Sequence, residues 1–456
     1  MKIFNTLSGK KEIFEPIEDN KIRMYVCGMT VYDDTHIGHA RTFLSFDLIV
    51  RYLRSIDYEV QYIRNITDVD DKIIARAEEL NISPSELTLD CINSMHNDFQ
   101  ALGMISPDAE PRATENIDSI ISLITKLIDK GHAYVSESDV YFSTESFEEY
   151  GKLSKRKLED MLSGARIDID LDKKNPADFV LWKKDTEGLK WDSPWGPGRP
   201  GWHIECSAMS MDALGETFDI HGGGSDLKFP HHENEIAQSE CVTGKEFAKV
   251  WMHTGSLRID EQKMSKSLKN FITIKEALND SSSEVLRFFL ISSHYRSPLN
   301  YSDEGLKEAK NSLDRLYNSL EDLSYETDEH IPSEYSEKFH DAMQDDFNSP
   351  SALSVLFEMV KQINILKKED QLTHANALAS ELISLSNILG ILSENPEEYF
   401  TSGINLSNED IEQAIERRNK ARQEKDFELS DKIRDDLLKE GIILEDKGTK
   451  TIWKKS

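Results

Sequence analysis

The chain has 456 residues, with 54 lysines and arginines against 84 aspartates and glutamates, so its formal net charge is −30 at pH 7. At roughly 150 residues per domain this length allows two to four domains with a sizeable core, which excludes a peptide hormone, a disulfide-stapled toxin and a small zinc module. Hydrophobic residues make up 38% and charged residues 30%, as in soluble globular proteins. Because the net charge repels polyanions, only local basic patches would hold a nucleic acid.

The four cysteines and the N-terminal segment point to the cytoplasm. Cys27, Cys91, Cys206 and Cys241 form no CxxC pair and are too few for a disulfide framework, so we expect reduced thiols. The first residues contain no continuous apolar stretch of the signal-peptide kind, and no run approaches the roughly 18 apolar residues of a membrane helix. The sequence therefore predicts a cytoplasmic protein with no membrane partner.

A strand–helix–strand unit is predicted near the N-terminus. Residues 21–27 form a β-type run, residues 28–35 contain turn formers, and residues 40–55 carry apolar side chains at helical spacing. A second strand is predicted over residues 60–66. Units of this kind build parallel sheets, including those that bind nucleotides.

The middle of the chain is predicted to contain an insertion. A helix is predicted over residues 114–130 and a hairpin-like strand over 133–143, followed by a polar, basic stretch at 151–166. Four of the six tryptophans then lie between residues 182 and 202 among prolines and glycines, which prevent a regular helix. This segment is either a rigid surface loop or a loop that lines the substrate site.

From about residue 306 the pattern is almost wholly helical. Apolar residues keep helical spacing over 306–323 and 353–366, and acidic connectors with prolines are predicted at 324–334 and 393–403. The tail is predicted to contain a helix that ends before Gly441, a strand at 442–445, a Lys-Gly turn and a last β-type run with an exposed Trp453. The sequence thus predicts a helical bundle and a small mixed tail.

The tetrapeptide His36-Ile37-Gly38-His39 stands after the first predicted strand, at the start of the predicted helix. A helix N-terminus offers free N–H groups and a partial positive charge to phosphates. The two imidazoles add donors, and the glycine leaves room for an adenine ring. Taken alone, the tetrapeptide is equally consistent with two surface histidines near a helix cap that bind no ligand.

A second short motif, Lys263-Met264-Ser265-Lys266-Ser267, follows far downstream. Two lysines in a loop can neutralise the charge that develops on an α-phosphate and a departing pyrophosphate. Alone, the pentapeptide would be a solvated loop. In this order after the first motif, the pair resembles the HIGH and KMSKS signatures of class I aminoacyl-tRNA synthetases.

A candidate metal site combines His231 and Glu235 with two cysteines. The histidine and the glutamate are four residues apart in a probable helix, so they share one face, whereas His232 is expected to point elsewhere. Cys27 is expected to end the first strand, and Cys206 is likewise expected at a strand end. Strand ends in an α/β sheet converge on the ligand crevice, so both thiols could meet the histidine and the glutamate there. The alternative to a metal site is that His231 and Glu235 are a solvated surface pair.

Long motifs extend the resemblance to one family. They are MYVCGMTVYDDTHIGHAR, RNITDVDDKI, PGWHIECSAMS, DIHGGGSDLKFPHHENEIAQSE, KMSKSLKN, HYRSPLNYS, DDFNSPSAL and KDFELSDKIRDDLLKEGIILED. In this order they resemble the cysteinyl-tRNA synthetases over essentially the whole chain.

The resemblance implies an α/β fold: a Rossmann-like parallel-sheet catalytic domain with an insertion, an α-helical bundle and a small mixed α/β C-terminal element. The implied divisions are 1–117 and 200–250 for the two halves of the catalytic domain, 118–199 for the inserted region at the tRNA acceptor end, 251–305 for the KMSKS-bearing stem-contact region, 306–400 for the anticodon-binding bundle and 401–456 for the C-terminal anticodon element.

The resemblance also implies a reaction, in which L-cysteine is joined to tRNA(Cys) through a cysteinyl-adenylate. It implies Mg²⁺ with ATP, one zinc ion per chain, a monomer and no DNA partner, and it gives Cys91 and Cys241 no role. The residues implied to bind ATP are His36, Gly38, His39 and Lys266, and those implied to be catalytic are His36, His39, Lys263 and Lys266. Cysteine is implied to be bound by Thr67, Trp202 and His221. The implied zinc ligands are Cys27, Cys206, His231 and Glu235.

Two other functions fit part of this pattern. A ligase that couples cysteine to an aminosugar shares the catalytic domain and its zinc site but needs no tRNA-reading tail. An acidic zinc-binding scaffold would need neither signature motif. For a tRNA partner, the predicted contacts are Lys152, Lys155, Arg156 and Lys157 in the insertion and Lys447, Lys450, Lys454 and Lys455 around Trp453 in the tail.

Overall fold

The computed structural model describes most of the chain as two compact units. Unit 1 contains Met1–Leu313, Ile331–Met359 and Ser384–Ile391, and unit 2 contains Asp314–His330, Val360–Ile383 and Leu392–Ser456. The described residues are 1–137, 139–156, 172–185, 188–259, 261–263, 271–325, 333–401, 408–439, 441–447 and 450–455. The six-part division implied by the sequence is finer than these two units and stays a prediction.

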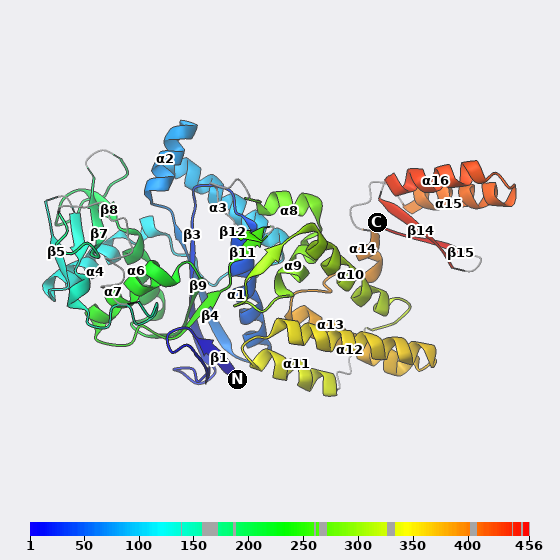
Figure 1. Ribbon diagram of the computed structural model, residues 1–456, viewed down its shortest axis with the longest axis horizontal. Coiled ribbons are helices and arrows are strands. Elements are labelled where there is room, and N and C mark those ends of the chain that lie inside the picture. Colours follow the sequence, from blue (N-terminus) through cyan, green and yellow to red (C-terminus); the bar gives the residue numbers. More distant parts are fainter. Residues whose placement is uncertain are drawn as a thin grey trace. The chain divides into compact units, whose positions relative to one another are not determined.

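A four-stranded parallel sheet forms the centre of unit 1 (Figure 1). Its strand order is β10 (Ala248–Thr254), β9 (Phe218–Gly224), β3 (Lys21–Thr30) and β4 (Glu59–Thr67), and each neighbouring pair is parallel. Helix α1 (Ile37–Ser55) connects β3 to β4. The predicted strand–helix–strand unit and the α/β fold class are therefore confirmed.

Strand β3 is longer than predicted. Residues 28–30, which were expected to begin a turn, continue the strand after a register shift between Val26 and Met29. Gly28 explains the close pairing at this point, because a Cβ on it would lie 1.7 Å from the carbonyl oxygen of Asn65. Cys27 therefore lies inside the strand rather than at its end.

Helices α1 and α6 (Trp202–Leu214) cover opposite faces of the sheet. A Cβ on Gly222 of β9 would lie 2.4 Å from the Phe46 ring of α1, so this residue faces α1. The preceding residue, His221, contacts the ring of Tyr25, which packs in one core cluster with Met209 of α6. Since consecutive strand residues face opposite sides, the sheet is buried on both faces.

The predicted insertion forms an antiparallel sheet of its own. The strand order is β5 (Ala133–Val135), β6 (Asp139–Phe142), β7 (Phe179–Lys184) and β8 (Gly198–Pro200). Helix α4 (Ile117–Asp129) packs with this sheet in a core that also contains Ile204 of α6 and Ala237 of α7 (Glu233–Thr243). The helix starts three residues later than predicted, because Ala113–Glu115 form a 3₁₀ turn.

The remaining elements of unit 1 surround the parallel sheet. They are β1 (Lys2–Asn5), β2 (Lys10–Ile13), α2 (Asp71–Leu80), α3 (Pro84–Ala101), the π-helical turn η3 (Lys228–His232), β11 (Leu257–Ile259), β12 (Gln262–Lys263), α8 (Ile274–Asp280), α9 (Ser283–Ile291), β13 (Leu299–Tyr301) and α11 (Glu334–Gln344). Three longer helices have residues in both units, because a unit boundary falls within each of them. They are α10 (Asp303–Leu320), α12 (Ser349–Lys368) and α13 (Leu372–Ile388).

Buried arginines fix helix α1 within unit 1. The guanidinium of Arg41 donates to backbone carbonyls after α9, among them that of His294 at 2.7 Å. Arg287 of α9 pairs with Asp47 of α1 and donates to the carbonyl of Leu389 at 3.0 Å. Breaking one side of such a buried pair costs about 3–5 kcal/mol, so α1 is held firmly at several points.

Unit 2 contains the tail. Its short elements are α14 (Pro396–Thr401), α15 (Asn408–Gln423), α16 (Phe427–Lys439) and the antiparallel pair β14 (Ile442–Lys447) and β15 (Lys450–Lys455). Two predictions are wrong here. The connector at 393–403 contains α14, and Trp453 is partly buried against a cluster that includes Ile415 and Ile433.

No helix among the described residues has the length and apolar character needed to cross a membrane.

Candidate active site

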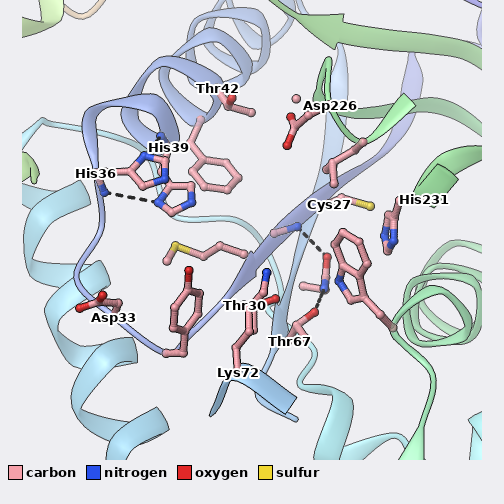
Figure 2. A pocket seen from close by; sticks show the side chains of 18 of the residues that line it. Cys27, Thr30, Asp33, His36, His39, Thr42, Thr67, Lys72, Asp226 and His231 are labelled. Carbon is pink, nitrogen blue, oxygen red and sulfur yellow. Dashed lines mark hydrogen bonds between the residues drawn. The ribbon is translucent and has the colours of Figure 1, made fainter. Parts of the chain in front are cut away.

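A pocket of about 240 Å³ opens at the carboxyl ends of β3 and β4, the edge at which parallel α/β sheets bind ligands. Its wall includes Cys27, Cys206 and His231 at one end and His36 and His39 at the other (Figure 2). Thr67 and Trp202 also line it. The structure thus brings the predicted metal ligands and the first signature motif to one cavity.

His36 and His39 begin helix α1 as predicted. His36 is the N-cap, its Nδ1 accepts from the backbone N–H of His39 at 3.1 Å, and the two rings stack at 3.5 Å. Gly38 lies between them as the second residue of the helix. A helix N-terminus with two imidazoles at a pocket wall suits a phosphate-bearing ligand.

The segment that follows the second motif returns to this helix start. The backbone N–H of Ile37 donates to the carbonyl of Ile272 at 3.1 Å, and that of Ile274 donates to Thr35 at 3.0 Å. The ring of Phe271 stands edge-on to His36 at 4.9 Å. Phe271, which follows the second motif in the sequence, is therefore part of the pocket wall.

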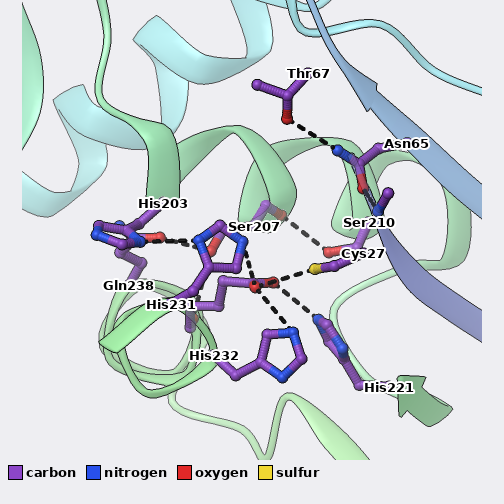
Figure 3. A network of polar contacts seen from close by, with 12 residues as sticks. Cys27, Asn65, Thr67, His203, Ser207, Ser210, His221, His231, His232 and Gln238 are labelled. Carbon is purple, nitrogen blue, oxygen red and sulfur yellow. Dashed lines mark hydrogen bonds and ion pairs between the residues drawn. The ribbon is translucent and has the colours of Figure 1, made fainter. Parts of the chain in front are cut away.

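Cys27, Cys206, His231 and Glu235 form a compact buried cluster. One ligand atom from each lies within 4.8 Å of the others. Figure 3 shows Cys27 and His231 in this cluster, with His203, His221 and His232 around them. Glu235 Oε1 lies 3.3 Å from Cys27 Sγ and 3.2 Å from His231 Nε2. Two sulfur atoms, one imidazole nitrogen and one carboxylate oxygen are a donor set typical of zinc.

Burial favours the uncharged forms of the two thiols and of the imidazole. It raises the pKa of the Cys27 thiol well above its ordinary value, an effect that Cys206 and Glu235 reinforce. The pKa of Cys206 is also raised, because burial and the charge of Glu235 outweigh a hydrogen bond with Cys27 that lowers it. Burial and the nearby His203 and His221 lower the pKa of His231 well below its ordinary value. A cation would therefore displace thiol protons as it binds.

Two details of the predicted metal site are wrong. Cys206 comes from helix α6 rather than from a strand end. His232 does not point elsewhere, because its Nε2 lies 3.9 Å from Glu235 Oε1. Residues three and four positions apart both lie alongside one another on a helix, so His232 and His231 both approach Glu235. Cys27, His221, His232 and Glu235 form a second possible ligand group.

Hydrogen bonds from neighbouring histidines orient the cluster. His221 Nε2 lies 2.8 Å from Glu235 Oε2, and its ring stacks on Trp251 at 4.3 Å. His203 Nδ1 lies 2.9 Å from His231 Nδ1, which leaves Nε2 of His231 to face Glu235. Partners of this kind fix the orientation of metal-binding side chains.

The residues predicted for cysteine separate into two groups. Thr67 and Trp202 line the pocket, whereas His221 is fully buried behind Glu235 and does not line it. The indole of Trp202 packs on His231 at 4.3 Å. Sequence reasoning missed Asn65, whose Oδ1 accepts from the N–H of Gly28 at 2.7 Å and whose Nδ2 donates to Thr67. Its presence in the RNITDVDDKI motif was the available signal.

Several predicted residues fall partly or wholly outside the described part of the structure. Lys266 and Lys157 lie outside it. The backbones of Lys263, Lys447, Lys450, Lys454 and Lys455 are described as strand, but their side chains are not. Of the basic residues predicted for the insertion, Lys152 pairs with Glu240, Lys155 Nζ donates to the carbonyl of Leu7, and Arg156 lies over the Phe229 ring.

Comparisons with known proteins define the class. Residues 13–311 match the family described as "tRNA synthetases class I (C) catalytic domain", and residues 338–393 match the DALR domain. A methionyl-tRNA synthetase from Mycobacterium tuberculosis, solved with methionyl-adenylate, superposes with a TM-score of 0.61 at 16% identity, covering 83% of this chain and 95% of that one. The LeuRS of Agrobacterium radiobacter K84 gives 0.55 at 11% identity, covering 88% and 93%. The fold is that of the class I aminoacyl-tRNA synthetases.

Curated relatives identify the branch of this class. Proteins named cysteine–tRNA ligase from Hahella chejuensis and Haemophilus influenzae are 54% and 53% identical, and each alignment covers 100% of both chains. The chain belongs to the cysteine–tRNA ligase family of class I aminoacyl-tRNA synthetases.

Proposed function

We propose that this protein joins L-cysteine to tRNA(Cys) in two steps, through a cysteinyl-adenylate, and that a zinc ion selects the cysteine. The observation that carries the proposal is a single pocket with the Cys27, Cys206, His231 and Glu235 cluster at one end and the His36–His39 helix start at the other. The first end suits a thiol held by a metal, and the second suits the phosphates and adenine of ATP.

The residues present fit zinc. Their four donor atoms are buried and within 4.8 Å of one another, and the histidine and carboxylate have partners that orient them. When bound, zinc supplies a centre that accepts a thiolate far better than a hydroxyl. This matters because shape alone separates cysteine from serine by only about 1–3 kcal/mol, too little for accurate translation without editing.

The remaining pocket residues position the reactants. Thr67 and Trp202 border the cysteine end, and His36, Gly38 and His39 receive ATP, which enters with Mg²⁺. Lys263 and Lys266 are proposed to stabilise the phosphates as pyrophosphate leaves. No side chain needs to act as a covalent nucleophile, so catalysis is mainly positioning and charge stabilisation.

The proposed partners beyond the small substrates are limited to tRNA, with no membrane or DNA partner, and the protein is proposed to act in the cytoplasm as a monomer. The match to the DALR domain over residues 338–393 supports an anticodon-reading role for the helical region. The proposed acceptor-end contacts are Lys152, Lys155, Arg156 and Lys157.

A charging assay separates this function from its closest rival. With cysteine, Mg-ATP and tRNA(Cys), we expect cysteinyl-tRNA to accumulate. With an aminosugar in place of tRNA, we expect no amide product. Formation of the aminosugar amide without tRNA charging would overturn the proposal in favour of the related ligase.

The tail offers a test of tRNA recognition. Replacing Lys450, Lys454 and Lys455 together by glutamine should reduce kcat/KM for tRNA by about tenfold, because phosphate contacts by such clusters carry much of the affinity for nucleic acid. Pyrophosphate exchange, which needs no tRNA, should stay within about twofold of the unchanged protein. We prefer this variant to deletion of residues 445–456, because Trp453 packs on the core of the tail.

The matched control is Lys245→Gln with Lys249→Gln, two exposed lysines of unit 1 that pair with Glu216 and Glu246. If the tail variant and the control have the same kcat/KM for tRNA, anticodon reading does not use the tail lysines. Equal loss of charging and exchange in the tail variant would instead indicate a folding defect.

A further inference from the structure

Lys72 is a pocket residue to which no role has yet been given. Among the described residues that line the pocket, it is the one side chain with a permanent positive charge. The other charged side chains on that described wall, apart from the histidines, are Asp33, Asp34 and Asp226. Figure 2 shows Lys72 beside Thr30 and Thr67, between the histidines of α1 and the end with Cys27 and His231.

The backbone of Lys72 is held in place at the start of helix α2. Its N–H donates to Oδ1 of the N-cap Asp70 at 2.8 Å, and the following residue, Ile73, is fully buried. The preceding residue, Asp71, pairs with Arg199 and with Lys183 on the neighbouring strands β7 and β8. These contacts fix the start of helix α2, so the backbone from which the Lys72 side chain extends is held in place.

The ammonium group of Lys72 has no carboxylate partner among the described residues. Its one recorded contact there is with the ring of Tyr32, at 5.7 Å from the centroid. Asp71 is engaged by Arg199 and Lys183, and Asp34 is engaged by Lys275 at 2.8 Å. A cation left without an anion at a pocket wall suits an anionic ligand.

The proposed reaction brings negative charge to this region of the pocket. With the thiol of cysteine at the metal cluster and ATP at the helix start, the carboxylate and the α-phosphate must meet between the two ends. A carboxylate oxygen then forms a bond to Pα while the bond from Pα to the bridging oxygen breaks, and pyrophosphate leaves with that electron pair. Asp33 and Asp226 on the wall would disfavour these anions unless a cation offsets them, whereas Asp34 is already paired with Lys275.

We propose that Lys72 stabilises the negative charge on the cysteine carboxylate and the α-phosphate of ATP as the two react. This inference rests on the proposed function and adds to it a catalytic residue on the β4–α2 side of the pocket. It differs from the roles proposed for Lys263 and Lys266, which are to stabilise the departing pyrophosphate.

Three variants test the proposal: Lys72→Met, which removes the charge and keeps the stem, Lys72→Arg, which keeps a charge, and Arg76→Met as the control. Arg76 is one turn further along α2, is partly exposed and pairs with Glu79. The measurement is the single-turnover rate constant for cysteinyl-adenylate formation, with KM for cysteine and ATP and zinc content determined in parallel.

We expect Lys72→Met to slow adenylate formation by about 100-fold, the size of the loss when one charge-stabilising group is removed. KM for ATP should change by less than about threefold, and zinc content and the thermal midpoint should equal those of the unchanged protein. Lys72→Arg should recover activity to within about tenfold, and Arg76→Met should stay within about twofold. A purely structural role would not give this recovery by charge.

Two results would overturn the proposal. One is adenylate formation by Lys72→Met within about threefold of the unchanged protein. The other is normal adenylate formation with slow transfer to tRNA, which would assign the lysine to a phosphate of the tRNA end. Failure of the proposed function looks different, because the unchanged protein itself would then form no cysteine-dependent adenylate.

Discussion

The Cys206→Ser protein should be isolated with less than about one tenth of the zinc bound by the unchanged protein, and its KM for cysteine should rise by about 100-fold or more. Cys206 is one of two thiols in a buried four-donor cluster, and a serine hydroxyl is a poor zinc ligand. Even changes in the groups around a metal site cost about 10–100-fold in affinity, so loss of a direct ligand should cost at least as much. Elemental analysis and cysteine-dependent pyrophosphate exchange give the two numbers.

Cys91→Ser is the matched control for this experiment. Cys91 is half-buried in a separate small cluster with Ile73 and Leu87, and it is not among the candidate ligands in the described part of the chain. The control should keep its zinc and its KM for cysteine. Full zinc occupancy in Cys206→Ser would contradict the ligand set, and it would favour the alternative group that includes His221 and His232.

The Lys266→Ala protein should form cysteinyl-adenylate about 100- to 1,000-fold more slowly than the unchanged protein, with KM for cysteine altered by less than about threefold. Its charge is proposed to act mainly as pyrophosphate leaves, and an interaction made only in the transition state lowers kcat rather than ground-state binding. Single-turnover kinetics separate the two effects.

Lys266→Arg should restore part of the lost rate, because it keeps a positive charge in the same loop. Unchanged single-turnover activation in Lys266→Ala would mean that the loop is only a solvated pair of lysines. Loss of cysteine binding with a normal rate constant would mean that Lys266 acts on the amino acid instead.

The regular part of the fold was predictable because it follows periodic patterns. The alternation over residues 60–66 and the helical spacing over 40–55 correspond to β4 and α1, and the HIGH motif stands at the predicted helix start. The turn formers from Gly28 onward predict that a turn begins there, but the structure continues the strand over residues 28–30. Gly28 is in the strand for another reason, since only glycine fits against the carbonyl of Asn65.

The candidate metal cluster was predictable only in part. The His231–Glu235 contact follows from helical spacing, although His231 lies in a π-helical turn before α7. Cys206 was assigned to a strand end because no local pattern tells which layer of an α/β fold carries a given residue. In the tail, pairing of Leu444 with Trp453 turns the tryptophan toward the small core, which the basic sequence around it did not indicate.

The polar residues of the pocket wall and of its surroundings were the least predictable. Asn65 and Lys72 acquire their positions from β4 and from the start of α2, and neither has a local spacing that suggests chemistry. The hydrogen bond between His203 and His231 joins helix α6 to the π-helical turn η3, which lies well downstream in the sequence. Contacts of this kind depend on tertiary packing rather than on periodicity.

The most direct test of the account is cysteine-dependent ATP–pyrophosphate exchange, measured for each amino acid in turn and repeated after the metal has been removed with a chelator. The account predicts exchange with cysteine, at least about 1,000-fold less with serine at equal concentration because the metal cluster selects the sulfur atom, and loss of the cysteine signal after chelation with recovery on adding zinc. Equal exchange with serine, or cysteine exchange that survives complete removal of zinc, would contradict it.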